Sequence, residues 1–139
     1  MKIYQHTQPS TVIVASLGAA AVGFAIGALF LHTLVFPMVI LGVSAWIFRS
    51  LTIEISDTEL IWYFGSGFPR KRVLLGDVVS AEPIRTSFLN GWGIHYTGRG
   101  WLYNVSGYGA VAIKLRNGTR FCLGTDEPEI LASHLIKHP

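Results

Sequence analysis

Charge is missing from the first third of the chain. No Asp, Glu, Lys or Arg occurs between Lys2 and Arg49, and all eight acidic residues lie beyond Arg49. An ionised side chain in hydrocarbon costs several kcal/mol, so a long uncharged stretch is typical of a membrane-embedded segment. The sequence therefore divides into a membrane part, residues 1–50, and a water-exposed part, residues 51–139.

Residue patterns for catalysis, cofactors and metals are also scarce. Cys122 is the single cysteine, and its default role is that of a core thiol. His134 and His138 lie one helical turn apart, where two histidines either share a metal or form a solvated face. The segment Gly107–Ala112 has the glycine spacing of a dinucleotide loop, but that motif needs a following helix and a strand follows here. We expect no catalytic residue, cofactor or metal, and we do not expect an enzyme.

The uncharged stretch is long enough for two helices. About 20 apolar residues span the roughly 30 Å of hydrocarbon in a bilayer. Residues 11–31 supply one such length and residues 34–50 a shorter one, with His32 and Thr33 as the polar break between them. This pattern predicts a tight transmembrane hairpin. A cleaved signal peptide is the alternative, because Lys2 followed by an alanine-rich apolar run resembles one.

The positions of basic residues predict the orientation of the hairpin. Lys2 precedes the first helix, and Arg49 and the cluster Arg70-Lys71-Arg72 follow the second. The turn between the helices carries no Lys or Arg. Positive residues beside membrane spans stay in the cytoplasm, so both termini are expected to be cytoplasmic. The predicted location is the inner (plasma) membrane.

Small residues recur at intervals of one helical turn in the membrane part. They are Ala15, Ala19, Gly23 and Gly27 in the first helix, and Gly42 and Ala45 in the second. Small residues let helix backbones approach closely in lipid. This row packs either on the second helix of the same chain or on another subunit, and the sequence leaves a homo- or hetero-oligomer open.

The water-exposed part is predicted to be all-β with a C-terminal helix. Residues 51–55 alternate as a half-buried strand does, and Asn117-Gly118 is a strong hairpin signal. Asp126 is the expected cap of a helix over residues 127–137. About seven closely spaced strands indicate a small barrel or sandwich. The expected core consists of Ile53, Ile55, Val111, Ile113, Leu115, Phe121, Leu123, Leu131 and Leu135.

Several short segments have a residue pattern similar to that of a known family. They are Gly91–Tyr96, Gly100–Val105, Asn117-Gly118 and Gly124–Asp126. With them, the chain resembles the bacterial pleckstrin-homology-like domain in its small membrane-anchored form with two transmembrane helices. The resemblance implies a binding or scaffolding module with no shared catalytic residues. Phosphoinositide-binding members of the wider superfamily use a basic first hairpin loop, whereas Ser56–Glu59 is acidic here and would repel an inositol phosphate.

The expected function is therefore that of a non-enzymatic, cytoplasm-facing module that binds another protein or organises a membrane assembly. One alternative is an accessory subunit held in a larger membrane complex through its hairpin. A second is a lipid- or small-ligand-binding domain. The formal net charge is only +3, which argues against nucleic acid as a partner. The aromatic residues Trp92, Tyr96, Trp101, Tyr103 and Tyr108 are expected either in the core or in an exposed patch for a partner.

One loop is predicted to return to the membrane surface. Strand 51–55 leads away from the bilayer and the next strand leads back, so residues 65–69 end near the headgroups. The residues predicted to contact the membrane surface are Arg49, Phe68, Arg70, Lys71 and Arg72. The alternative for this loop is a solvated hairpin tip.

Overall fold

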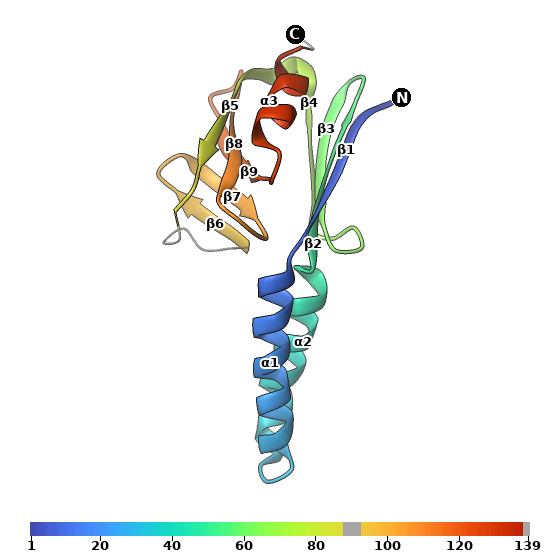
Figure 1. Ribbon diagram of the computed structural model, residues 1–139, viewed down its shortest axis with the longest axis vertical. Helices are drawn as coiled ribbons and strands as arrows, with labels where there is room; N and C mark the ends of the chain where they lie inside the picture. The colour runs from blue at the N-terminus through green and yellow to red at the C-terminus, as the bar shows by residue number, and fades with distance from the viewer. Residues whose placement is uncertain (88–92, 138–139) are drawn as a thin grey trace.

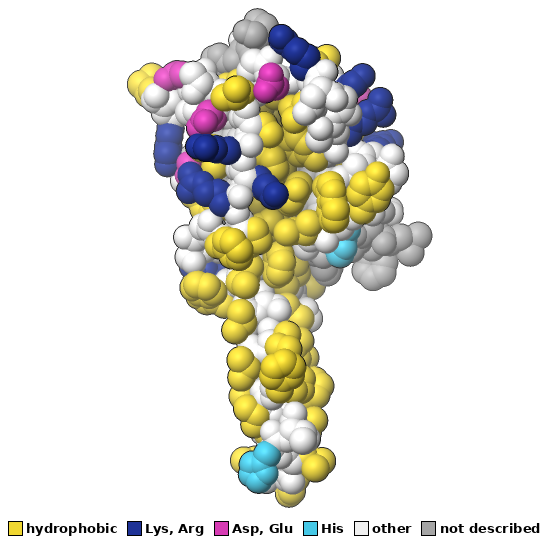
Figure 2. Space-filling view, turned by 180° about the vertical axis from the view of Figure 1, so that it is seen from behind, with side chains coloured by type: hydrophobic (Ala, Val, Ile, Leu, Met, Phe, Trp, Pro, Cys, Tyr) yellow, Lys and Arg dark blue, Asp and Glu magenta, His cyan; other side chains and the backbone are white. Residues whose placement is uncertain are grey.

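The molecule has a helical stalk and a β-rich head (Figure 1). The computed structural model describes residues 1–87 and 93–137. Helices α1 and α2 stand side by side as the stalk, and two sheets with helix α3 form the head at one end of it. Figure 2 shows that the stalk surface is mainly hydrophobic, whereas basic and acidic side chains lie on the head. The uncharged residues from Thr11 to Ile47 form the stalk, and the charged remainder lies in the head together with the residues before Thr11.

The stalk consists of α1 (Thr11–Ala28), the 3-10 helix η1 (His32–Leu34) and α2 (Val35–Ile47). Among the described residues, α1 is the one helix long and apolar enough to cross a membrane, with a mean hydropathy of 2.0 over 18 residues. The stretch from η1 through α2 is apolar but shorter. Both helices end three residues before the predicted positions 31 and 50. The predicted end of the second helix is wrong because the chain enters a β-sheet at Ser50.

The first sheet has the strand order β1-β2-β3-β4, with antiparallel neighbours throughout. Its strands are β1 (Lys2–Pro9), β2 (Ser50–Ser56), β3 (Glu59–Phe64) and β4 (Arg70–Leu74). The sequence does not predict β1, because its few apolar residues do not alternate. Since β1 precedes the stalk and β2 follows it, their pairing joins the two ends of the stalk at what we call the neck.

The second sheet follows the short helix η2 (Leu75–Asp77) and has the order β5-β8-β9-β7-β6. Its strands are β5 (Val78–Arg85), β6 (Gly93–Thr97), β7 (Gly100–Asn104), β8 (Gly109–Leu115) and β9 (Arg120–Gly124). The β7–β9 pair is parallel and the other pairs are antiparallel. The described residues thus form nine strands, not about seven. The two sheets stay separate, so the head is an open two-sheet structure and not a closed barrel.

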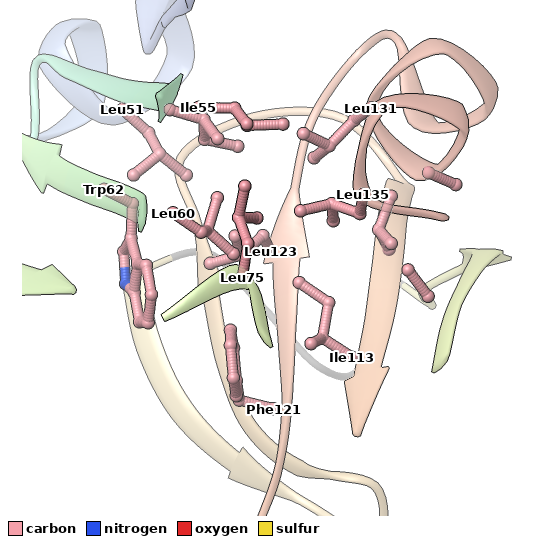
Figure 3. Close-up of a cluster of buried hydrophobic side chains, with 14 of the residues drawn as sticks. Leu51, Ile55, Leu60, Trp62, Leu75, Ile113, Phe121, Leu123, Leu131 and Leu135 are labelled. Atoms are coloured by element: carbon pink, nitrogen blue, oxygen red, sulfur yellow. The ribbon is translucent and has the colours of Figure 1, made fainter. Parts of the chain in front are cut away.

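The core lies between the two sheets and under α3 (Pro128–Ile136). All nine predicted core residues are confirmed, since each is at most 7 % exposed. Figure 3 shows Leu131 and Leu135 of α3 pointing toward Leu123 and toward the residues of β2 and β3. Trp62 stacks on Phe121 across the sheets, with ring centroids 4.9 Å apart.

The start of α3 differs from the prediction by one residue. Glu127, not Asp126, precedes the first helical turn, and its side chain makes no capping hydrogen bond. The carboxylate of Asp126 instead contacts Nε2 of His6 on β1, at 2.5 Å. The Asp126 side chain, which local rules assigned to the cap, thus binds a residue of β1 that is distant in the sequence.

Candidate functional site

The loop between β3 and β4 rests against the end of the stalk. The backbone N–H of Gly65 donates to the carbonyl oxygen of Ser50 at 2.9 Å. Gly65 has φ +52°, and a Cβ there would lie 2.7 Å from the carbonyl oxygen of Ile47 in α2. A side chain at this position therefore meets both a strained backbone and a steric clash. Figure 1 shows the loop at the stalk end of the head, as predicted for residues 65–69.

Aromatic and basic side chains gather at this end of the head. Phe68 is 75 % exposed at the tip of the loop. The Arg49 guanidinium lies 5.5 Å from the ring centroid of Trp46, and that of Arg70 lies 5.2 Å from the ring centroid of Tyr63. Such amphipathic rings and basic groups are enriched where hydrocarbon meets water.

Two of the predicted surface residues lie farther from the stalk. β4 runs away from it, so that Lys71 is opposite Trp62 and Arg72 is opposite Ile61 on β3. Nη1 of Arg72 lies 4.0 Å from a carboxylate oxygen of Glu59. The structure brings Arg49, Phe68 and Arg70 to the stalk end of the head, and Lys71 and Arg72 continue along the strand. Contact of these residues with lipid stays a prediction.

The row of small residues in α1 does not line the contact with α2 along its whole length. Ala15, Ala19 and Gly23 are exposed. Gly27 is half-buried, and a Cβ there would lie 2.7 Å from Cδ1 of Leu34. In α2, Ala45 is half-buried, whereas Gly42 is exposed, and a Cβ added to it would have no neighbouring atom within 4 Å. Most of the row therefore faces outward from the stalk.

Buried polar side chains converge on the loop between β7 and β8, beside the neck. Nε2 of Gln8 donates to the carbonyl oxygen of Ser106 at 3.0 Å, and Oγ of Ser10 donates to that of Val105 at 2.9 Å. Asn104, fully buried, bonds the same loop through both its amide nitrogen and its amide oxygen. Buried polar groups that are satisfied in this way fix a loop in one conformation. Sequence reasoning missed this network, because Gln8, Ser10 and Asn104 resemble ordinary surface residues.

A groove of about 580 Å³ opens next to this loop. We call it the neck groove; Gln8, Arg85, Tyr108, Thr125, Asp126 and Glu129 are among the residues that line it. Its walls come from the end of β1, the end of β5, the β7–β8 loop and the start of α3. Gly107 and Gly109, which suggested a dinucleotide loop by their spacing, belong to a turn and a strand in this wall. The strand β8 follows them instead of a helix, as the sequence analysis predicted, so the segment is not a dinucleotide loop.

A second polar cluster ties β1 to the start of α3. The Tyr4 hydroxyl donates to a carboxylate oxygen of Glu127 at 3.1 Å, and the Tyr4 ring lies 4.9 Å from that of His134. Burial, together with the nearby Glu127 carboxylate, raises the pKa of Tyr4 well above its usual value. With the contact between His6 and Asp126, these bonds hold the first strand against the last helix.

Candidate reactive groups are few in the described part of the chain. Burial raises the pKa of the Cys122 thiol, although the nearby Arg99 opposes this shift, so the thiol stays protonated at neutral pH. Within residues 1–87 and 93–137, no three His, Cys, Asp or Glu side chains are placed to hold a metal ion. The two interpretations of His134 and His138, a shared metal or a solvated face, depend on His138, which lies outside the described residues.

Two of the clustered aromatic residues are exposed side by side. Tyr96 on β6 is 74 % exposed and Trp101 on β7 is 49 % exposed, with ring centroids 5.6 Å apart in an edge-to-face arrangement. Tyr103 packs against Trp62 instead, and Trp92 lies outside the described residues.

The chain matches no protein-family model, and no curated protein or solved structure matches it.

Proposed function

We propose that this protein is a non-enzymatic binding module, anchored in the inner membrane by its two stalk helices, with its head on the cytoplasmic face. In this proposal the head is a pleckstrin-homology-like domain that binds a protein partner or organises a membrane assembly. Two stacked sheets and a C-terminal helix support the likeness. The parallel β7–β9 pair and the strand that precedes the stalk are departures from an antiparallel barrel.

The pairing of β1 with β2 carries the membrane part of the proposal. Paired strands lie about 5 Å apart, whereas the two faces of a bilayer are separated by about 30 Å of hydrocarbon. A single crossing by α1 would put β1 and β2 on opposite faces and prevent their pairing. Both helices therefore cross, or neither does. The apolar helix α1, of which only 6 % is buried, favours lipid as its surroundings.

The same pairing argues against a cleaved signal peptide. Cleavage after α1 would remove β1 from the sheet and leave the edge of β2 open. It would also remove Gln8 and Ser10 from the polar network at the neck. The basic residues at Lys2 and Arg49, with none in the turn, favour the cytoplasmic orientation of the head.

In this proposal the β3–β4 loop rests on the lipid headgroups. The packing of Gly65 against α2 and the exposure of Phe68 support it. A fluorophore or spin label at residue 68 should report shallow lipid contact, because the loop lies at the stalk end of the head. A label at residue 57, in the turn at the far end of β2, should report water. Equal exposure to water at both positions would contradict the proposed surface contact.

The exposed pair Tyr96 and Trp101 is the best candidate for the contact with a protein partner. Tyr and Trp are enriched in the few residues that dominate binding energy at protein interfaces. We expect the double variant Tyr96→Ser/Trp101→Ser to lose a partner that the intact protein retains in mild detergent. The head should stay folded, because both side chains are exposed. A partner retained by this variant does not bind through the aromatic pair.

The exposed row on α1 favours a second candidate function, an accessory subunit held in a complex through its stalk. Ala15, Ala19 and Gly23 leave room for another helix to approach closely. The variant Ala19→Leu/Gly23→Leu is the matching test. Loss of the partner from this variant, but not from the aromatic variant, would assign the interaction to the stalk.

A further inference from the structure

Opposite charges face the neck groove without neutralising each other. Arg85 lines it from the end of β5, and Asp126 and Glu129 line it from the start of α3. Among the described residues no salt bridge joins Arg85 to either carboxylate. The Arg85 guanidinium lies over the ring of Tyr108, 6.0 Å from its centroid. Nε2 of His6 already contacts Asp126, whereas Glu129 makes no salt bridge among the described residues. A ligand that carries both signs of charge would therefore satisfy Arg85 and Glu129 at once.

The interior of the groove offers a further unsatisfied group. Gln8 is 5 % exposed and lines the groove, and its Oε1 has no hydrogen-bond partner within the described chain. Its Nε2 donates to the carbonyl of Ser106, which fixes the orientation of the amide. A buried acceptor without a donor is costly. Oε1 is itself closed to solvent in this structure, so a ligand N–H group would remove this cost if a small movement of the wall let it reach that oxygen.

The walls that carry these groups are held in place before any ligand arrives. The backbone N–H of Thr125 donates to the carbonyl oxygen of Gly109 at 3.0 Å, and a Cβ on Gly109 would lie only 2.5 Å from the Thr125 carbonyl oxygen. The backbone N–H of Thr86 donates to the carbonyl oxygen of Tyr108 at 2.6 Å. A pre-organised site loses less conformational entropy on binding.

We propose that the neck groove binds a zwitterion of the phosphoethanolamine type, with its phosphate at Arg85 and its primary ammonium between Glu129, Asp126 and Gln8. Arginine presents a fork of donors that matches phosphate oxygens. A quaternary ammonium would need an aromatic cage. Among the described residues that line the groove, Tyr108 is the one aromatic residue, and the Arg85 guanidinium lies over its ring. An amine with N–H donors suits the carboxylates and the amide oxygen.

The place of the groove in the molecule gives this zwitterion two sources. Gln8 lies on β1 close to Thr11, where α1 begins, so a phospholipid headgroup is within reach if the stalk crosses a membrane. A free metabolite with the same two groups is the other source. Binding of the soluble headgroup does not depend on the proposed membrane role, so the two proposals can fail separately.

The test uses the full chain in detergent and titrates it calorimetrically with glycerophosphoethanolamine. We expect saturable binding that the variants Arg85→Gln and Glu129→Gln each weaken about tenfold or more, as expected for a lost charge-assisted hydrogen bond. Glycerol 3-phosphate lacks the amine and glycerophosphocholine lacks its N–H donors, so both should bind correspondingly less well. The matched controls are Lys114→Gln and Glu82→Gln, which remove a base and an acid outside the groove.

Bilayer nanodiscs then distinguish the two sources. The site is assigned to a lipid if discs that contain phosphatidylethanolamine compete with the soluble headgroup for the groove and discs of phosphatidylglycerol do not. Binding that is the same in both discs assigns it to a free zwitterion. The proposal is overturned by absence of saturable binding, by equal binding of all three soluble probes, or by equal effects of the groove and control variants.

Discussion

At several positions in and near the neck, the room for a side chain and its hydrogen bonds determine which residue fits, more than its hydrophobicity does. Gly65 is required where a loop meets the end of α2, and Gln8 and Ser10 hold the β7–β8 loop through side-chain bonds. Glu54 is 8 % exposed and accepts hydrogen bonds from Lys2 and Tyr63. Each of these residues connects segments that are far apart in the sequence, and so none could be assigned its role from local pattern.

Replacing Gly65 by Ala should destabilise the head. The added Cβ would lie 2.7 Å from the Ile47 carbonyl oxygen in a left-handed backbone conformation, and such strain costs about 1–3 kcal/mol. Thermal unfolding in detergent should show a lower Tm. The control is Gly76→Ala, where nothing lies within 4 Å of the added carbon. An equal Tm for the two variants would show that the loop does not press on α2.

The stability of the head should fall as the pH falls through the range in which Glu54 titrates. Burial acts to raise the pKa of Glu54, but hydrogen bonds from Lys2 and Tyr63 outweigh it and hold the pKa below its ordinary value of 4.5. A carboxyl with a lowered folded-state pKa stabilises the fold above its unfolded pKa and loses this contribution at lower pH. Denaturant unfolding at pH 7 and at pH 3 should therefore differ less for Glu54→Gln than for the wild type. The same pH dependence in both would exclude this carboxyl as a contributor.

At the level of elements, the sequence predicted those that a local period defines and missed those that distant pairing defines. The alternation in β2 and β8 identified inward-facing residues such as Ile53 and Ile113, and all nine predicted core residues are buried. β1 has no such alternation, and its partner begins only at Ser50. In the sequence β8 lies between β7 and β9, yet β7 and β9 are neighbours in the sheet and run parallel. No turn signal in the sequence predicts this pairing. The polar lining of the neck groove was missed for the same reason.

The packing of helix α3 on the head should depend on the side chains of its one buried face. Leu131 is fully buried, whereas its neighbour Ile130 is 48 % exposed. Truncation of a buried leucine to alanine costs about 2–5 kcal/mol, which is a large part of the stability of a small domain. Leu131→Ala should therefore lower the denaturation midpoint far more than Ile130→Ala, as followed by urea titration. Similar midpoints would mean that α3 is not packed in solution as it is in the structure.

For the whole molecule, the key property is that the stalk is inserted into a sheet of the head. Most of the uncharged stretch, from Thr11 to Ile47, forms the stalk, and the charged remainder lies in the head (Figures 1 and 2). What the sequence could not show is that residues on both sides of the stalk belong to the same sheet. The predicted boundary at residue 50 therefore falls at the edge of a head strand, and the first strand belongs structurally with the head.

The proposed topology predicts that the turn of the stalk faces the outside of the cell. Cys122 is the single cysteine and is buried, so Thr33→Cys in a Cys122→Ala background provides a unique accessible thiol. A membrane-impermeant thiol reagent added to intact cells should label this variant. A cysteine at Asp57, on the head, should be labelled only after the membrane is opened. The reverse result would invert the topology, and labelling of both in intact cells would place the protein outside the cytoplasm.

The pairing at the neck also imposes an order of events during synthesis. The ribosome makes β1 first and reaches β2 only after residues 10–49, a delay of a few seconds at roughly 5–20 residues per second. During that time β1 is an unpaired strand, and unpaired apolar strands aggregate. Lys2, Gln5, His6, Thr7 and Gln8 make most of β1 polar. The polar composition of β1 is the reason that the strand is not predicted from the sequence. The same composition keeps the unpaired strand soluble until β2 is synthesised.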